Sequence, residues 1–310
     1  MEAIRRAVID VGTNSIKLLV ADVRGRDVQP VHEESRQTRL GKGFYETHRL
    51  QPEPIARTAE AVWEFAEIAR EKNAGSIRVI ATSAARDAVN PIDLTGCIFR
   101  ASGLQTEIIT GTLEAEWVFH GVTTDADLTR QPLLLLDVGG GSTEFIVGGG
   151  GEKHFAHSFP LGTVRLMEKF PHSDPPKKSE FKACRDWLKH FLHHEIRPQV
   201  EPALKNEAGE ILLVGTGGTT SILARMEKAL DRFDRDKIER TILSFEHIVA
   251  HRKHLWKLPL EERKEIPGLP KLRADVILTG ALIYEMVMEE FGFKQLRVST
   301  RGLRFAAVME

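Results

Sequence analysis

Three glycine-rich turns carry the residues of this chain that are best suited to chemistry, and each follows a short apolar run. They are residues 10–15 (DVGTNS, the first turn), 137–144 (DVGGGSTE, the second turn) and 215–220 (GTGGTT, the third turn). Glycine lets the backbone approach a ligand closely and aim its N–H groups at it. Clustered N–H and O–H donors suit phosphate oxygens, and an aspartate beside them can hold a hard cation. The turns therefore predict a phosphate-handling site.

The first two turns join strands, whereas the third joins a strand to a helix. Apolar runs over 7–9 and 16–23 flank the first turn, and runs over 133–136 and 145–147 flank the second, so both predict hairpins. Their shared Asp-Val-Gly indicates an internal duplication. A strand over 211–214 precedes the third turn and a helix over 221–230 follows it. None of the turns fits the P-loop or the dinucleotide-binding fingerprint.

Strands alternate with helices in the rest of the chain, which predicts an α/β fold. We expect a helix over 54–72 with Pro54 at its first position, strands over 77–81 and 106–109, and a helix over 113–119. Residues 171–206 and 227–265 have mostly helical patterns. The repeat places one domain at 1–125 and a second at 126–297, with 298–310 returning to the first.

Composition indicates an ordinary soluble protein of 310 residues, with 42% hydrophobic and 28% charged residues and a net charge of −1. There is no apolar run of membrane-spanning length and no room for a signal peptide before the first strand. Cys97 and Cys184 form no metal or disulfide pattern, so we expect a cytoplasmic protein. We also expect no membrane or nucleic-acid partner. Two further groups are interpreted as exposed polar positions: the basic stretch over 252–273, and His247, His251 and His254, which lack a carboxylate partner pattern.

The three turns, in this order, resemble the phosphate and adenosine motifs of the actin-like superfamily. More specifically, the chain resembles the exopolyphosphatase/guanosine pentaphosphatase (Ppx/GppA) family. Residues 81–88 (ATSAARDA), 109–115 (ITGTLEA), 267–280 and 299–304 resemble further motifs of that family. Leu113 and Glu116 depart from its pattern. The resemblance implies two actin-like (ribonuclease H-like) domains facing across a central cleft.

The resemblance also implies roles for individual residues. Glu114 matches the general base, and Arg86 and Arg273 are candidate phosphate clamps. Candidate ligands of Mg²⁺ or Mn²⁺ are the three acids Asp10, Asp137 and Glu144. Candidate phosphate donors are Thr13, Asn14, Ser15, Gly139, Gly140, Gly141, Ser142 and Thr143, and the third wall is formed by Gly215, Gly217, Gly218 and Thr219.

The function expected from these residues is Mg²⁺-dependent release of terminal phosphate from inorganic polyphosphate. Hydrolysis of the 5′-phosphate of pppGpp in the same site is the nearest alternative. A small-molecule kinase that binds ATP at 215–219 and a non-catalytic nucleotide-gated filament or sensor are further alternatives. The chain stops after the two-domain core, as in the short subfamily, which predicts a preference for short polyphosphates. A homodimer is possible, although no residue pattern specifies its interface.

Overall fold

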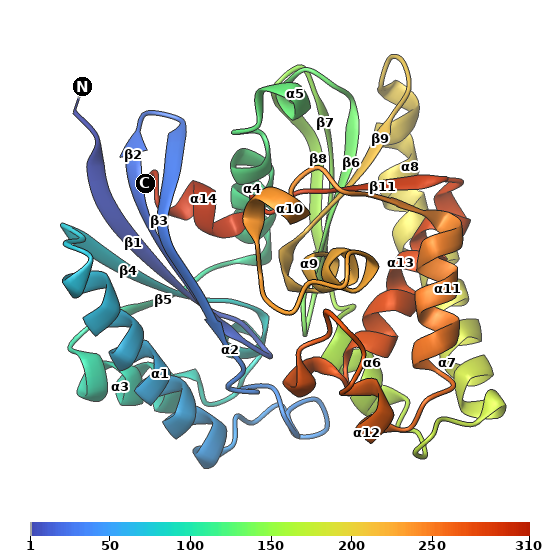
Figure 1. Ribbon diagram of the computed structural model, residues 1–310, viewed down its shortest axis with the longest axis horizontal. Coiled ribbons are helices and arrows are strands. Elements are labelled where there is room, and N and C mark those ends of the chain that lie inside the picture. Colours follow the sequence, from blue (N-terminus) through green and yellow to red (C-terminus); the bar gives the residue numbers. More distant parts are fainter. Residues whose placement is uncertain (1) are drawn as a thin grey trace. The chain divides into compact units, whose positions relative to one another are not determined.

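The computed structural model describes residues 2–310, which form two compact α/β units (Figure 1). The first unit contains Met1–Asp125 and Arg301–Glu310, and the second contains Ala126–Thr300. The predicted α/β class is confirmed, because each unit has its own sheet with helices packed on it. No helix within residues 2–310 is long and apolar enough to cross a membrane.

The sheet of the first unit has the order β3-β2-β1-β4-β5. Strands β1 to β3 form an antiparallel meander, whereas β4 and β5 run parallel to β1. The strands are β1 (Ile4–Val11), β2 (Ile16–Arg24), β3 (Asp27–Arg36), β4 (Ser76–Ala81) and β5 (Thr106–Ile108). The helices are α1 (Pro52–Glu71), α2 (Ser83–Arg86), α3 (Pro91–Ser102), α4 (Gly111–Val122) and α14 (Leu303–Ala307).

The side chains of β1 point alternately to the two faces of the sheet, and both faces are buried in its second half. Ile9 and Val11 pack into an apolar cluster with Val62 and Phe65 of α1. Because successive side chains of a strand point to opposite faces, Asp10 points away from that cluster. Helix α1 begins at Pro52, two positions before the predicted Pro54. A proline at the first helical position loses no hydrogen bond, so Pro52 is the better start.

The sheet of the second unit has the order β10-β11-β9-β6-β7-β8. Its strands are β6 (Leu133–Val138), β7 (Thr143–Gly149), β8 (Glu152–Phe159), β9 (Leu212–Thr216), β10 (Ile242–Ser244) and β11 (Gln295–Val298). Its longer helices are α6 (Thr163–Lys169), α7 (Lys178–Phe191), α8 (Arg197–Asn206), α9 (Gly217–Glu227), α11 (Phe245–Leu255) and α13 (Ile277–Phe291). Shorter segments are α5 (Ala126–Thr129), η1 (Leu192–Ile196, a π-helix), α10 (Arg235–Ile238), α12 (Leu260–Arg263) and η2 (Lys271–Arg273).

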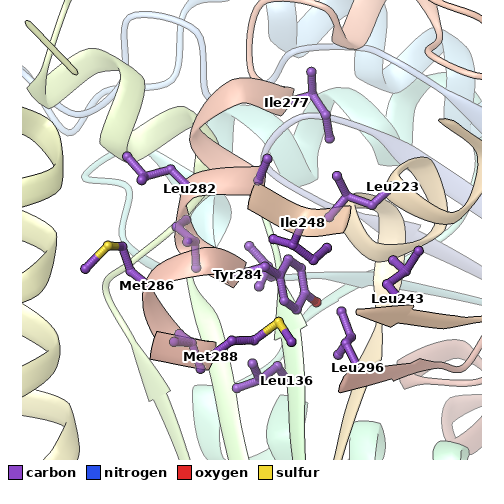
Figure 2. Packing of buried hydrophobic residues seen from close by; sticks show 14 of the residues in the cluster. Leu136, Leu223, Leu243, Ile248, Ile277, Leu282, Tyr284, Met286, Met288 and Leu296 are labelled. Atoms are coloured by element: carbon purple, nitrogen blue, oxygen red, sulfur yellow. The ribbon is translucent and has the colours of Figure 1, made fainter. Parts of the chain in front are cut away.

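Helix α13 is the centre of the second core. Every residue from Ile277 to Met288 is buried, so this helix is enclosed around its whole circumference rather than along one stripe, and Glu285 within it pairs with Arg252. Tyr284 lies among Leu136 of β6, Leu223 of α9 and Leu296 of β11 (Figure 2). This packing holds β6, from which the second turn emerges, against α9, which follows the third turn.

Both predicted hairpins are confirmed, but each is extended by a third strand that was not predicted. These strands, β3 and β8, are edge strands with mostly polar or charged residues, and β3 contains Pro30. Edge strands commonly carry charges and proline because one side of their backbone is unpaired, which obscures the alternation expected of a strand. The segment 296–298 lies in β11 of the second unit, and the chain returns to the first unit at Arg301.

Candidate active site

The first and second turns have the same backbone geometry. The N–H group of Gly12 donates to the carbonyl of Ser15 at 3.0 Å, and that of Gly139 donates to the carbonyl of Ser142 at 3.0 Å. A Cβ atom at either glycine would lie 3.0 Å from that serine oxygen. The duplication expected from Asp-Val-Gly therefore extends to the hydrogen bonding of the turns.

The carbonyl groups of the second turn are taken up by the segment that leads into α6. The carbonyls of Gly139 and Gly140 accept backbone N–H groups of α6 at 3.0 and 2.8 Å, and that of Gly141 accepts Nε of Arg165 at 2.7 Å. The backbone N–H groups of Gly140, Gly141 and Ser142 receive no partner from residues 2–310. The turn thus keeps adjacent N–H donors for an anion, as the sequence predicts.

The first turn is held in a similar way by a different loop. The carbonyl of Thr13 accepts the N–H of Gly41 at 2.7 Å, and that of Asn14 accepts the N–H of Arg39 at 3.0 Å. Nδ2 of Asn14 and Oγ of Ser15 are buried without a hydrogen-bond partner among residues 2–310. Buried polar atoms are rarely left unsatisfied, so these two donors indicate a ligand position.

The third turn shapes the surroundings of Asp137 rather than forming a hairpin. Gly217 has a positive φ of 82°, and a Cβ atom there would lie 2.0 Å from Oδ1 of Asp137. Helix α9 begins at this glycine, so its first N–H groups have no partner within the helix. Oγ1 of Thr219 donates to the carbonyl of Val138 at 2.7 Å, which ties α9 to β6. Gly215 and Gly218 complete the turn, at the end of β9 and the start of α9.

One predicted donor is used inside the protein. The side chain of Thr143 is fully buried, and its hydroxyl donates to the carbonyl of Leu161 at 2.5 Å. Its hydroxyl therefore serves to hold the chain after β8 against β7 instead of facing a ligand.

The candidate metal ligands are carboxylates at the ends of strands, of which Asp10 and Glu144 are buried and Asp137 is half-buried. Asp137 lies opposite Glu144 in the antiparallel β6–β7 pair, so both side chains share one face of the sheet. In the first unit, Asp10 lies opposite Lys17 instead. No group of three or more His, Cys, Asp and Glu side chains suited to a metal occurs within residues 2–310.

Asp10 has the burial and the electrostatics expected of a cation ligand. Its side chain is buried, and Oδ1 has no hydrogen-bond partner in the described part of the chain. Burial raises the pKa of Asp10, and the charges of Lys17 and Arg304 only partly oppose that shift. A buried carboxylate of this kind is costly unless a cation approaches it. The oxygen donors of Asp10, Asp137 and Glu144 fit a hard cation such as Mg²⁺.

Glu114 and Arg86 are brought together by the edge of the first sheet. Strands β1, β4 and β5 are parallel, and their carboxyl ends lead to the first turn, to α2 and to α4. Glu114 lies in the first turn of α4 and is only 7% exposed. Nη1 of Arg86 donates to Oε2 of Glu114 at 2.8 Å and to the carbonyl of Ile109 at 3.2 Å. Arg86 therefore contacts the candidate base directly.

The two departures from the family pattern lie beside this pair. Leu113 is half-buried, and its backbone N–H donates to the capping hydroxyl of Thr110 at 3.2 Å. The side chain of Glu116 is 41% exposed and lies 3.7 Å from His120. Neither interaction involves Glu114.

The basic stretch over 252–273 is only partly solvated, contrary to expectation. Arg273 is 8% exposed and Arg263 is 1% exposed. Nη2 of Arg263 donates to Asp174 at 3.4 Å, while its Nε and Nη1 have no hydrogen-bond partner within residues 2–310. The sequence could not indicate this burial, because the partner lies far away along the chain.

The histidine interpretation also needs a correction. His247 and His251 do have a carboxylate partner, since Nδ1 of His247 lies 3.0 Å and Nε2 of His251 lies 2.9 Å from Glu227. Glu227 is the last residue of α9, so α9 and α11 supply the pair together. Both histidines therefore contact one carboxylate, and no group of His, Cys, Asp and Glu suited to a metal occurs there among the described residues.

Comparison with known proteins identifies the family of the chain. The sequence profile of the Ppx/GppA phosphatase family matches residues 19–309. The chain belongs to this family. A relative named Exopolyphosphatase 2, from Mycobacterium tuberculosis, is 35% identical over 98% of this chain and 97% of its own length.

Two solved structures are similar to this chain in both sequence and fold. The Ppx/GppA enzyme of Aquifex aeolicus is 30% identical with a TM-score of 0.78, and the comparison covers 99% of both chains. An exopolyphosphatase from Cytophaga hutchinsonii is 27% identical with a TM-score of 0.86, over 97% of this chain and 96% of that chain. The family resemblance, the actin-like fold class and the expectation of a phosphoanhydride hydrolase are thereby confirmed.

Proposed function

We propose that the protein is an exopolyphosphatase, which releases terminal orthophosphate from inorganic polyphosphate with the help of Mg²⁺ or Mn²⁺. The observation that carries the proposal is the buried Glu114 carboxylate held by Arg86 at 2.8 Å. A carboxylate fixed in this way supports a reaction with water rather than simple binding. The relatives named exopolyphosphatase support polyphosphate as the substrate.

In the proposed reaction, a water molecule attacks the terminal phosphorus atom. A new P–O bond forms to the water oxygen, and the bond to the bridging oxygen breaks. Glu114 accepts a proton from the attacking water, while the shortened chain leaves on the bridging oxygen. The products are orthophosphate and a polyphosphate one residue shorter. No covalent intermediate on the protein is needed.

The turns have the proposed task of binding the phosphoryl oxygens. Backbone N–H groups of Gly140, Gly141 and Ser142 supply donors in the second unit, and Asn14 and Ser15 supply donors in the first. Such donors are already oriented before the substrate arrives, because other segments take up the carbonyls of both turns.

Each unit offers carboxylates for a cation, Asp10 in the first and the paired Asp137 and Glu144 in the second. When bound, it would offset the negative charge of the phosphoryl oxygens. Arg273 is proposed as a phosphate clamp, and Arg86 is proposed to orient Glu114 in addition to binding phosphate.

A substrate comparison tests the proposal. The protein is incubated with Mg²⁺ and, separately, with polyphosphates of several defined lengths, pppGpp and ATP, and released phosphate is measured. We expect the largest kcat/KM with polyphosphate. Faster release from pppGpp would instead identify a pppGpp phosphohydrolase, and transfer of phosphate from ATP to an added sugar or acetate would identify a kinase.

A further inference from the structure

Three side chains lie in a row across the second sheet, one on each of β6, β7 and β8. Asp137 pairs in register with Glu144, and Glu144 pairs in register with Ser158. Directly opposed residues of antiparallel strands share one face, so the row is continuous. Oγ of Ser158 donates to Oε1 of Glu144 at 2.7 Å. No sequence pattern pointed to Ser158, because the strand that carries it was not predicted.

The first unit has the same register with different chemistry. There Asp10 pairs with Lys17, and Lys17 pairs with Ser35. A serine thus occupies the same position of the third strand in both repeats, but in the first it lies opposite a lysine. Ser35 is exposed and no hydrogen bond of its hydroxyl occurs within residues 2–310. Only the second repeat combines the serine with a carboxylate.

The backbone around Ser158 is well anchored. The next residue, Phe159, is 3% exposed and packs in the core of the second unit. Just beyond it, the carbonyl of Leu161 accepts the hydroxyl of Thr143. Glu144 itself is 2% exposed, so its carboxylate cannot easily replace a lost donor with bulk water. The hydroxyl of Ser158 is therefore a fixed donor to a buried acceptor.

We propose that Ser158 is a positioning residue, which orients the carboxylate of Glu144 toward the divalent cation. This inference rests on the proposed function, because it takes Glu144 as a metal ligand. A hydrogen bond to Oε1 restricts rotation of the carboxylate about its last bond. In other metal sites, loss of a partner that orients a metal ligand commonly lowers metal affinity by roughly ten- to a hundredfold.

Direct binding of Mn²⁺ tests the proposal without relying on turnover. The affinity is measured by electron paramagnetic resonance of free Mn²⁺ in wild type, Ser158→Ala, Ser158→Thr and the control Ser35→Ala. We expect Ser158→Ala to weaken Mn²⁺ binding about tenfold. Ser158→Thr retains a hydroxyl and should restore most of the affinity, and Ser35→Ala should bind like wild type. Thermal melting without metal identifies any loss of folding.

A double variant separates positioning from a general structural effect. If Ser158 acts through Glu144, Ser158→Ala should weaken Mn²⁺ binding little further in a Glu144→Gln background. In turnover, Ser158→Ala should raise the Mg²⁺ concentration needed for half-maximal rate while leaving kcat at saturating Mg²⁺ close to wild type.

The results that would overturn the proposal are distinct from failure of the proposed function. Wild-type Mn²⁺ affinity in Ser158→Ala, or an equal loss in the Glu144→Gln background, would overturn it, as would a wild-type protein that binds no Mn²⁺. If instead wild type binds Mn²⁺ with the expected dependence on Ser158 but releases no phosphate from polyphosphate, the proposed function fails and the role of Ser158 stands.

Discussion

Replacement of Gly162 by alanine should displace the second turn without touching any candidate catalytic side chain. Gly162 precedes α6 and has an extended φ of −151°, so alanine causes no backbone strain there. Its Cβ would nevertheless lie 2.4 Å from the carbonyl carbon and oxygen of Gly140 and 2.5 Å from the nitrogen of Gly141. These are backbone atoms, which cannot rotate away as a flexible side chain could.

The distance by which the second turn must move sets the expected loss of activity. Ordinary contact begins at 3.4 Å, so the turn and α6 must separate by about 1 Å to accommodate the methyl group. A displacement of about 1 Å in binding groups can cost on the order of a hundredfold in rate. We therefore expect Gly162→Ala to lower kcat/KM for polyphosphate about a hundredfold, which corresponds to about 2.7 kcal/mol. The overpacking should also destabilise the fold by about 1–3 kcal/mol.

The assay compares phosphate release and urea denaturation of Gly162→Ala with those of a matched glycine variant. Gly96 lies inside α3, and a Cβ there meets only the end of the Arg100 side chain at 3.4 Å. Gly96→Ala should therefore retain full activity and gain up to about 1 kcal/mol from helix propensity. Wild-type kcat/KM in Gly162→Ala would refute the idea that the packing of α6 positions the second turn.

Other predictions concern buried ionisable groups. Asp10→Asn should abolish most phosphate release yet raise the free energy of unfolding by about 1–3 kcal/mol at pH 8 without divalent cations, because it removes a buried, unpartnered carboxylate. Since the pKa of Asp10 is raised, this stabilisation should shrink as the pH falls through that pKa and vanish below about pH 4; a less stable variant at pH 8 would contradict the argument. Burial raises the pKa of Cys184 to about 12, so a thiolate-specific reagent at pH 8 should modify only Cys97 until the protein is unfolded, and rapid modification of both in the native state would contradict this. Arg263→Met should leave the urea-unfolding free energy unchanged or raise it by about 1–4 kcal/mol, because burial lowers the pKa of Arg263 and its partner Asp174 is half exposed; a large loss would show that the ion pair stabilises the fold.

Local sequence signals were sufficient for the turns and their strands. The Asp-Val-Gly repeat predicted two hairpins, and both have the same bond between glycine N–H and serine carbonyl. These features depend on residues close together in the sequence, which is why they could be predicted.

Features that depend on distant residues could not be predicted in the same way. Arg263 is buried against Asp174, and the carboxylate of Glu227 contacts two histidine side chains of α11. No local sequence pattern connects these residues. The first residues of α6 hold the second turn with backbone N–H groups, which carry no residue-specific signal. Ser158 was missed because β8 is a polar edge strand whose composition resembles a loop.

Glu114→Gln gives the most direct test of the central claim. Glutamine keeps the size of the side chain and can still accept a hydrogen bond from Arg86, but it cannot take a proton from water. We expect phosphate release from polyphosphate at saturating Mg²⁺ to fall by about 10²–10⁴-fold, with an unchanged circular dichroism spectrum and a melting temperature close to wild type. Phosphate release at the wild-type rate by the folded variant would contradict the account.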